Sequence, residues 1–153
     1  MKICIVSSSG GHLIKSFFLR KWWENHDRLW ITRDDAISRE LLQDEEVLFG
    51  FFPEIRNGTN FLRNLFFAIK ILGAQKPDLV FSMGAGIAPP FFLVAKILGI
   101  KTVFIETFIF RSKPTLSGRI ISFFKLADVF LVQNKKLKKV YPNAQYWGRL
   151  IDV

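Results

Sequence analysis

The feature that most constrains the fold of this chain is the regular alternation of short apolar runs with longer patterns of helical spacing. The short runs are rich in β-branched and aromatic residues, which is typical of strands. The expected strands are residues 2–6, 28–32, 47–52, 78–82, 101–105, 128–132 and 144–147. The expected helices are residues 12–24, 36–43, 60–73, 89–98 and a segment that ends near residue 126. This alternation predicts an α/β fold: a Rossmann-like parallel sheet with helices on both faces, built as a single domain from residues 1–153.

Two glycine-rich turns each follow an expected strand and precede an expected helix. They are residues 7–12 (Ser-Ser-Ser-Gly-Gly-His) and residues 82–86 (Ser-Met-Gly-Ala-Gly). Glycine lets the backbone approach a ligand closely, and the N-terminus of a helix attracts anions. In a parallel sheet both turns meet at the carboxyl edge, where ligands bind. An alternative is that the glycines only close the packing of strand against helix. The spacing matches neither the dinucleotide fingerprint nor the P-loop, which disfavours a stand-alone nucleotide-binding enzyme.

The charge of the chain is +9 and is unevenly distributed. Residues 101–153 contain ten basic and three acidic residues. Such asymmetry suggests an anionic partner, which could be a nucleic acid, a lipid surface or a phosphorylated substrate. No nucleic-acid recognition motif accompanies the charge, so we expect no nucleic-acid partner. The chain has a single cysteine, Cys4, so no internal disulfide or metal site is expected and a reducing compartment is favoured. We also expect no cofactor.

The expected helices 12–24 and 60–73 are apolar over most of their circumference, with a few basic residues among the apolar ones. Aromatic and basic residues mix in this way at a membrane interface, although both helices could instead be covered by protein. The residues expected to face a membrane are Leu19, Trp22, Trp23, Arg63, Phe67 and Lys70. The longest uncharged run, residues 79–95, is broken by glycine and proline and is too short to span a bilayer. We expect no transmembrane helix, and no leader segment before the first strand.

Several short motifs occur together in this chain and resemble one family. They are residues 8–12 (SSGGH), 82–86 (SMGAG) with Pro89, 105–106 (IE) with Arg111, 116–119 (LSGR), 127–130 (ADVF) with Gln133, and 141–142 (YP) with Gly148. The combination resembles the acceptor-binding, membrane-associating subunit of the split N-acetylglucosaminyltransferase of dolichol-linked oligosaccharide synthesis. It is still more similar to the bacterial counterparts of that subunit in capsular and exopolysaccharide gene clusters.

The resemblance implies that the chain is one half of a GT-B glycosyltransferase, similar to the N-terminal half of the enzyme that makes lipid II. This half would bind a polyprenyl-diphosphate-linked saccharide as a peripheral protein on the cytoplasmic face of the membrane. A separate partner chain would bind the UDP-sugar donor, giving a hetero-oligomer. An alternative is a non-catalytic scaffold that recruits a partner glycosyltransferase to the membrane and enhances its activity.

Glycosyl transfer to a hydroxyl needs a general base, and the resemblance gives two catalytic candidates, His12 and Glu106. His12 could instead cap its turn or bind phosphate. Glu106 could act as the base, orient the acceptor sugar, or form a salt bridge with Arg111 or Lys113. Arg111 suits bidentate contact with phosphate. The expected acceptor- and diphosphate-binding residues are Ser9, Gly10, Gly11, Gly84, Ala85, Gly86 and Arg111.

Overall fold

The computed structural model describes residues 1–106 and 114–150, and this part of the chain forms a seven-stranded sheet in the order β3-β2-β1-β4-β5-β6-β7. Every pair of neighbouring strands is parallel. The strands are β1 (Lys2–Val6), β2 (Asp27–Thr32), β3 (Glu46–Phe49), β4 (Leu79–Ser82), β5 (Lys101–Glu106), β6 (Val129–Val132) and β7 (Gln145–Tyr146). The helices are α1 (Gly11–Phe17), α2 (Arg20–Trp23), α3 (Ala36–Leu41), α4 (Gly58–Gln75), α5 (Ala88–Leu98), α6 (Leu116–Phe123) and the 3₁₀ helix η1 (Lys135–Lys139).

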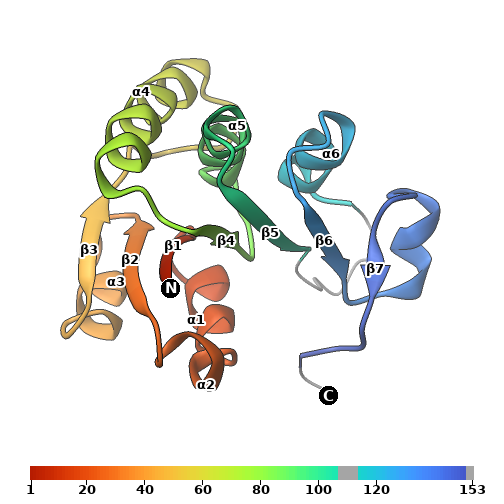
Figure 1. Ribbon diagram of the computed structural model, residues 1–153, viewed down its shortest axis with the longest axis horizontal. Coiled ribbons are helices and arrows are strands. Elements are labelled where there is room, and N and C mark those ends of the chain that lie inside the picture. Colours follow the sequence, from red (N-terminus) through yellow and green to blue (C-terminus); the bar gives the residue numbers. More distant parts are fainter. Residues whose placement is uncertain (107–113, 151–153) are drawn as a thin grey trace.

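The helices lie on both faces of the sheet (Figure 1). Helices α4, α5 and α6 cover one face, and α1, α2 and α3 lie on the other, over β1 to β3. This arrangement confirms the predicted α/β fold, with a parallel sheet and helices on both faces. Among the described helices, none is both long enough and apolar enough to cross a bilayer.

Each face of the sheet carries its own apolar core. Helices α4, α5 and α6 pack on one face around Phe91, Phe92 and Phe104, and the opposite face is built around Trp23, Trp30 and Phe81. The central strand β1 is buried on both faces, as expected in a parallel sheet covered by helices. Cys4 lies in this strand with no exposed surface, and burial raises the pKa of its thiol to about 12.

Three expected element boundaries are wrong, each because a side chain bonds to the backbone in a way that the pattern does not reveal. The helix expected over 12–24 is interrupted after Phe17, and the indole Nε1 of Trp23 donates to the Ser16 carbonyl at 2.8 Å. The strand expected over 47–52 ends at Phe49, because the Asn64 side chain binds both the N–H and the C=O of Phe51. Helix α4 begins at Gly58 and is capped by Asn57, not by Asn60.

On the sheet face that carries α1 and α2, strands β4, β5 and β6 present Phe81, Ile105 and Leu131. An apolar groove of about 340 Å³ lies there, beside the C-terminal part of the described chain. Its apolar lining includes Leu19, Trp22, Phe81, Val103, Ile105, Leu131 and Trp147.

Candidate active site

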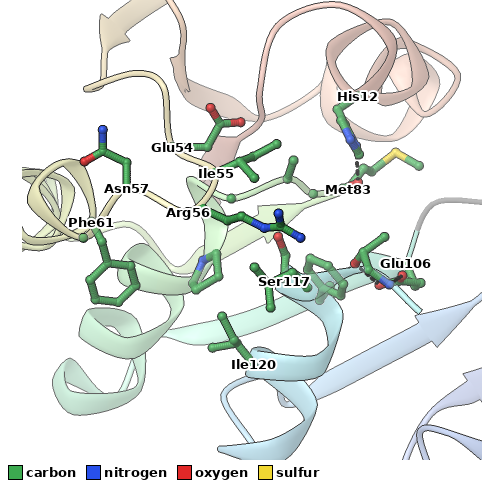
Figure 2. A pocket seen from close by; sticks show the side chains of 18 residues that line it. His12, Glu54, Ile55, Arg56, Asn57, Phe61, Met83, Glu106, Ser117 and Ile120 are labelled. Atoms are coloured by element: carbon green, nitrogen blue, oxygen red, sulfur yellow. Dashed lines mark hydrogen bonds between the residues drawn. The ribbon is translucent and has the colours of Figure 1, made fainter. Parts of the chain in front are cut away.

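An apolar cavity with a volume of about 400 Å³ lies at the carboxyl edge of the sheet. The turns after β1 and β4, the end of β5, the segment that leads into α4 and the start of α6 all contribute to its lining (Figure 2). It therefore brings together His12, the second glycine turn (84–86) and Glu106. The predicted convergence of these loops at the carboxyl edge is confirmed.

His12 is held against the second glycine turn. Its Nδ1 lies 2.9 Å from the carbonyl oxygen of Met83. A carbonyl oxygen only accepts hydrogen bonds, so Nδ1 carries the proton and Nε2 is the basic nitrogen of the neutral ring. A Cβ on Gly84 would lie 3.0 Å from the ring, and Gly84 has φ +102°, so this close approach requires glycine. Burial lowers the pKa of His12, which favours the neutral imidazole.

Glu106 is only 1% exposed and is fixed by the N-cap of α6. Its Oε1 accepts from the backbone N–H of Thr115 at 2.9 Å, and its Oε2 accepts from the Thr115 hydroxyl at 3.0 Å. A Cβ on Gly118 would lie 2.1 Å from Oε2, so α6 can approach the carboxylate only with glycine there. Burial raises the pKa of Glu106, and the two bonds from Thr115 oppose this shift. Arg111 and Lys113, its possible salt-bridge partners, lie outside the described residues.

Tyr141 completes the surroundings of this carboxylate. A Cβ on Gly118 would also lie 2.7 Å from the Tyr141 hydroxyl, so that hydroxyl and the Glu106 carboxylate share the space beside Gly118. Burial, followed by the charge of Glu106, raises the pKa of Tyr141. The neutral phenol is therefore the stable form beside the carboxyl group.

The first glycine turn faces carboxylates. The Ser8 hydroxyl donates to Glu54 at 2.5 Å, and the Ser9 hydroxyl donates to Asp35 at 2.8 Å. Ser9 and Gly10 line a separate hollow beside these two acidic side chains, and neither they nor Gly11 line the cavity of His12. Diphosphate binding by Ser9, Gly10 and Gly11 stays a prediction, and two nearby negative charges oppose it.

The second glycine turn lines the cavity through Gly84, Ala85 and Gly86. A Cβ on Gly86 would lie 2.7 Å from Cγ of Glu54, so glycine here lets the segment before α4 pack against the turn. The helix that follows, α5, has prolines at positions 89 and 90 in its first turn. Proline has no N–H, so this helix start offers fewer donors to an anion than its sequence position suggests.

Sequence reasoning missed the segment 54–58, which forms one wall of the cavity with Glu54, Ile55, Arg56 and Asn57. A usable signal was present, because the loop after β3 also leaves the carboxyl edge of the sheet. Thr115 and Ser117 at the start of α6 were missed as well. Arg111, predicted to contact phosphate, lies outside the described residues.

Two of the residues predicted to face a membrane, Trp23 and Phe67, pack against other side chains of the protein. For Trp23 the prediction is wrong. Trp23 is 1% exposed and packs edge-on against Trp30. Phe67 is half-buried, with its ring 6.0 Å from Phe51 and 6.1 Å from Phe91.

The other four membrane predictions divide between the groove and the surface of α4. Leu19 and Trp22 line the apolar groove, where the Trp22 ring lies 5.2 Å from Phe81. Arg63 and Lys70 are exposed on α4. The apolar side chains exposed on the same helix are Leu62, Phe66 and Ile69.

The parallel sheet with helices on both faces, and the loops that meet at its carboxyl edge, give an α/β unit of the GT-B fold. Solved structures with this fold include MurG of Acinetobacter baumannii, which is 19% identical with a TM-score of 0.68 over 88% of this chain and 42% of that one. A UDP-N-acetylglucosamine 2-epimerase of Rickettsia bellii is 15% identical with a TM-score of 0.75 over 98% of this chain and 45% of that one. These likenesses show the fold.

Sequence comparison identifies the family. Residues 55–150 match the family described as "Oligosaccharide biosynthesis protein Alg14 like", and the chain belongs to it. The human UDP-N-acetylglucosamine transferase subunit ALG14 is 32% identical over 96 residues, which are 59% of this chain and 44% of the human protein. A Synechocystis N-acetylglucosamine transferase that acts on a pyrophosphoryl-undecaprenol is 27% identical over 119 residues, 71% of this chain and 34% of that protein. The chain thus spans less than half the length of these relatives, and the resemblance inferred from its motifs is confirmed at the level of the family.

Proposed function

We propose that this chain is the acceptor-binding subunit of a two-component glycosyltransferase. Its substrate would be a polyprenyl-diphosphate-linked saccharide of capsular or exopolysaccharide synthesis, and a partner subunit would bind the UDP-sugar donor. The observation that carries the proposal is the cavity in which His12 and Glu106 meet apolar side chains of α4 and α6. A sugar hydroxyl needs the polar end, and the first part of a lipid needs the apolar walls. The human relative is named as a subunit, which supports a hetero-oligomer.

The geometry favours His12 as the base of the proposed reaction. The acceptor hydroxyl would lose its proton to Nε2 while its oxygen forms the new bond to the anomeric carbon of the donor. The bond from that carbon to the diphosphate would break, and UDP would leave with the bonding electrons. Nδ1 stays bound to the Met83 carbonyl, which holds the ring in position throughout.

Glu106 has a different role in this proposal. Its two oxygens are already bound to Thr115, so the carboxylate is fixed rather than free to move. A fixed carboxylate can accept a hydrogen bond from a second hydroxyl of the acceptor sugar and orient the reacting one. We therefore assign Glu106 to orienting the acceptor.

The surface of α4 supports a peripheral position on the cytoplasmic face of the membrane. Leu62, Phe66 and Ile69 are exposed on this helix, and Arg63 and Lys70 lie among them. Exposed apolar side chains can enter the headgroup region, and basic side chains are attracted to anionic lipids. Helix α4 begins at the cavity, so a lipid-linked acceptor could pass from the bilayer to His12.

The test is transfer of labelled sugar from UDP-sugars to a polyprenyl-diphosphate-linked saccharide in membranes. It would compare this chain, the chain encoded beside it in the genome, and both together. Transfer by the pair alone supports the proposal. Transfer by the neighbour alone reduces this chain to a scaffold, and transfer by this chain alone contradicts the two-component assignment.

The His12→Asn variant tests the base within the active pair. We expect transfer to fall roughly a hundredfold or more, whereas His26→Asn, which changes the other histidine and lies outside the cavity, should leave it unchanged. The base acts when neutral and its pKa is lowered, so activity should decline only when the pH falls below the ordinary histidine pKa of about 6.5. An intact complex with undiminished transfer by His12→Asn and Glu106→Gln would favour the scaffold.

A further inference from the structure

Arg56 places a positive charge in the cavity, and neither the sequence motifs nor the family match gives it a role. Its side chain is exposed, lines the cavity and extends toward Ser117 (Figure 2). Within residues 1–106 and 114–150, no carboxylate lies within ion-pair distance of its guanidinium. An arginine without a carboxylate partner inside a pocket is available to an anionic ligand.

The backbone at Arg56 gives a second reason to connect this side chain with a ligand. Its φ is +52°, a left-handed conformation that glycine adopts more easily. Two other non-glycine residues in the described chain share this conformation, Lys76 and Lys125. Both lie within two residues of the C-terminus of a helix, where this conformation is common. Arg56 instead precedes a helix. An arginine therefore occupies a backbone position that glycine would adopt with less strain, and such positions cluster at functional sites.

The two glycine turns are poorer places for an anion than Arg56. The serine hydroxyls of the first turn bind Glu54 and Asp35, so that turn already holds two negative charges. The second turn leads into a helix whose first turn contains Pro89 and Pro90, which have no N–H to donate. By contrast, the 18-residue helix α4 begins at Gly58, and both Gly58 and Arg56 line the same cavity.

We propose that Arg56, assisted by the amide of Gly58, binds the diphosphate group of the lipid-linked acceptor. This rests on the proposed function and names the residue that selects the class of acceptor. The planar guanidinium can bond two oxygens of a phosphate at once, and the helix N-terminus adds a favourable dipole.

The position of Arg56 fits the order of groups in such an acceptor, in which the diphosphate joins the sugar to the prenyl chain. His12 and Glu106 lie at one side of the cavity and Phe61 at the other, and Arg56 extends between them (Figure 2). Ile55 and Leu62 continue the apolar surface outward along the segment that leads into α4 and along α4 itself. A sugar placed at His12 would therefore have its diphosphate at Arg56 and its lipid against α4.

Binding of geranyl diphosphate, measured by calorimetry, tests this assignment on the whole chain. We expect Arg56→Gly to weaken binding roughly ten- to a hundredfold, because a charge-assisted contact is lost. Its thermal stability should not fall, because glycine suits the backbone at this position. Arg56→Lys should lose less affinity. Arg39→Ala is the matched control, because this arginine lies on α3 and pairs with Asp34 outside the cavity.

Two further ligands identify the group that is bound. Geranyl monophosphate should bind more weakly than the diphosphate to the wild type, and the difference should shrink in Arg56→Gly. Binding of UDP tests whether the site holds the diphosphate of the nucleotide donor instead of that of the lipid-linked acceptor. A loss of UDP binding with geranyl diphosphate binding retained would overturn the proposal, as would unchanged geranyl diphosphate binding by a folded Arg56→Gly chain.

Failure of the Arg56 assignment can be distinguished from failure of the proposed transferase function. If the pair of chains transfers sugar while Arg56→Gly binds geranyl diphosphate normally, only the assignment of Arg56 fails. If binding depends on Arg56 but no combination of chains transfers sugar, the diphosphate site stands and the transferase function fails.

Discussion

Two helical regions of this protein look alike in sequence and differ in what they expose. The α1–α2 region and α4 both combine large apolar residues with lysine and arginine. In α2, Trp23 is 1% exposed and packs into the core below the sheet. In α4, Phe66 is 69% exposed and Leu62 and Ile69 are each more than half exposed. A large aromatic side chain therefore joins the core in α2, whereas an aromatic side chain in a similar sequence context remains on the surface in α4.

The difference comes from the length and continuity of the helices. Helix α4 has 18 residues without a break, so one stripe packs on the sheet and the opposite stripe remains exposed. The α1–α2 region changes direction after Phe17, and this change carries Trp23 toward Ser16 and Trp30. A broken helix can bury side chains that a continuous one would expose.

The largest expected effect is on folding stability. Replacing Trp23 with alanine should lower the free energy of unfolding by about 3–5 kcal/mol, because a fully buried indole and its hydrogen bond are lost. Replacing Phe66 with alanine should change it by no more than about 0.5 kcal/mol. Urea unfolding of both variants measures the contrast, and equal destabilisation would show that the two regions do not differ as described.

The next effect is on membrane binding. A triple change of Leu62, Phe66 and Ile69 to serine should weaken binding to anionic vesicles by more than tenfold, because each buried apolar side chain contributes about 1.5–3 kcal/mol. Ile37→Ser is the control, because Ile37 is exposed on α3, on the opposite face of the sheet. Vesicle sedimentation gives the binding constants. A larger loss of binding with Ile37→Ser would show that the opposite face of the sheet binds the membrane.

The smallest effect concerns charge. Lys70→Gln should weaken binding to anionic vesicles by about 1 kcal/mol, and the difference should disappear in high salt, where such attraction is screened. Vesicles made only of neutral lipids supply the control, since wild type and variant should bind them equally. A salt-independent difference would mean that Lys70 acts through packing and not through its charge.

The fold could be predicted because the sequence patterns that indicate its strands and helices are local and recur along the chain. Each apolar run and each helical pattern is visible in the sequence, and their alternation permits few topologies. The positions of His12, Gly84 and Glu106 followed from one rule, that loops at the carboxyl ends of parallel strands converge.

The rest of the site depends on contacts between distant residues. The segment with Glu54 and Arg56 reaches the cavity because Gly86, about thirty residues later, leaves room for it. The carboxylate of Glu106 is fixed by Thr115 and by the missing Cβ of Gly118. The sequence does not show which side chain a glycine makes room for. The contacts of Gly86 with Glu54 and of Gly118 with Glu106 could therefore not be predicted from the spacing of residues in the sequence.

The burial of Cys4 has a practical consequence for spectroscopy. The chain has one cysteine, and its thiol lies in the central strand without exposed surface and with a pKa of about 12. A thiol reagent reacts with the accessible thiolate, so the folded wild-type chain behaves as if it had no cysteine. A cysteine introduced on α4 or beside the groove would accept a fluorophore or a spin label at that single place. Its signal could then report the arrival of a vesicle or a partner subunit without any change to the native strand.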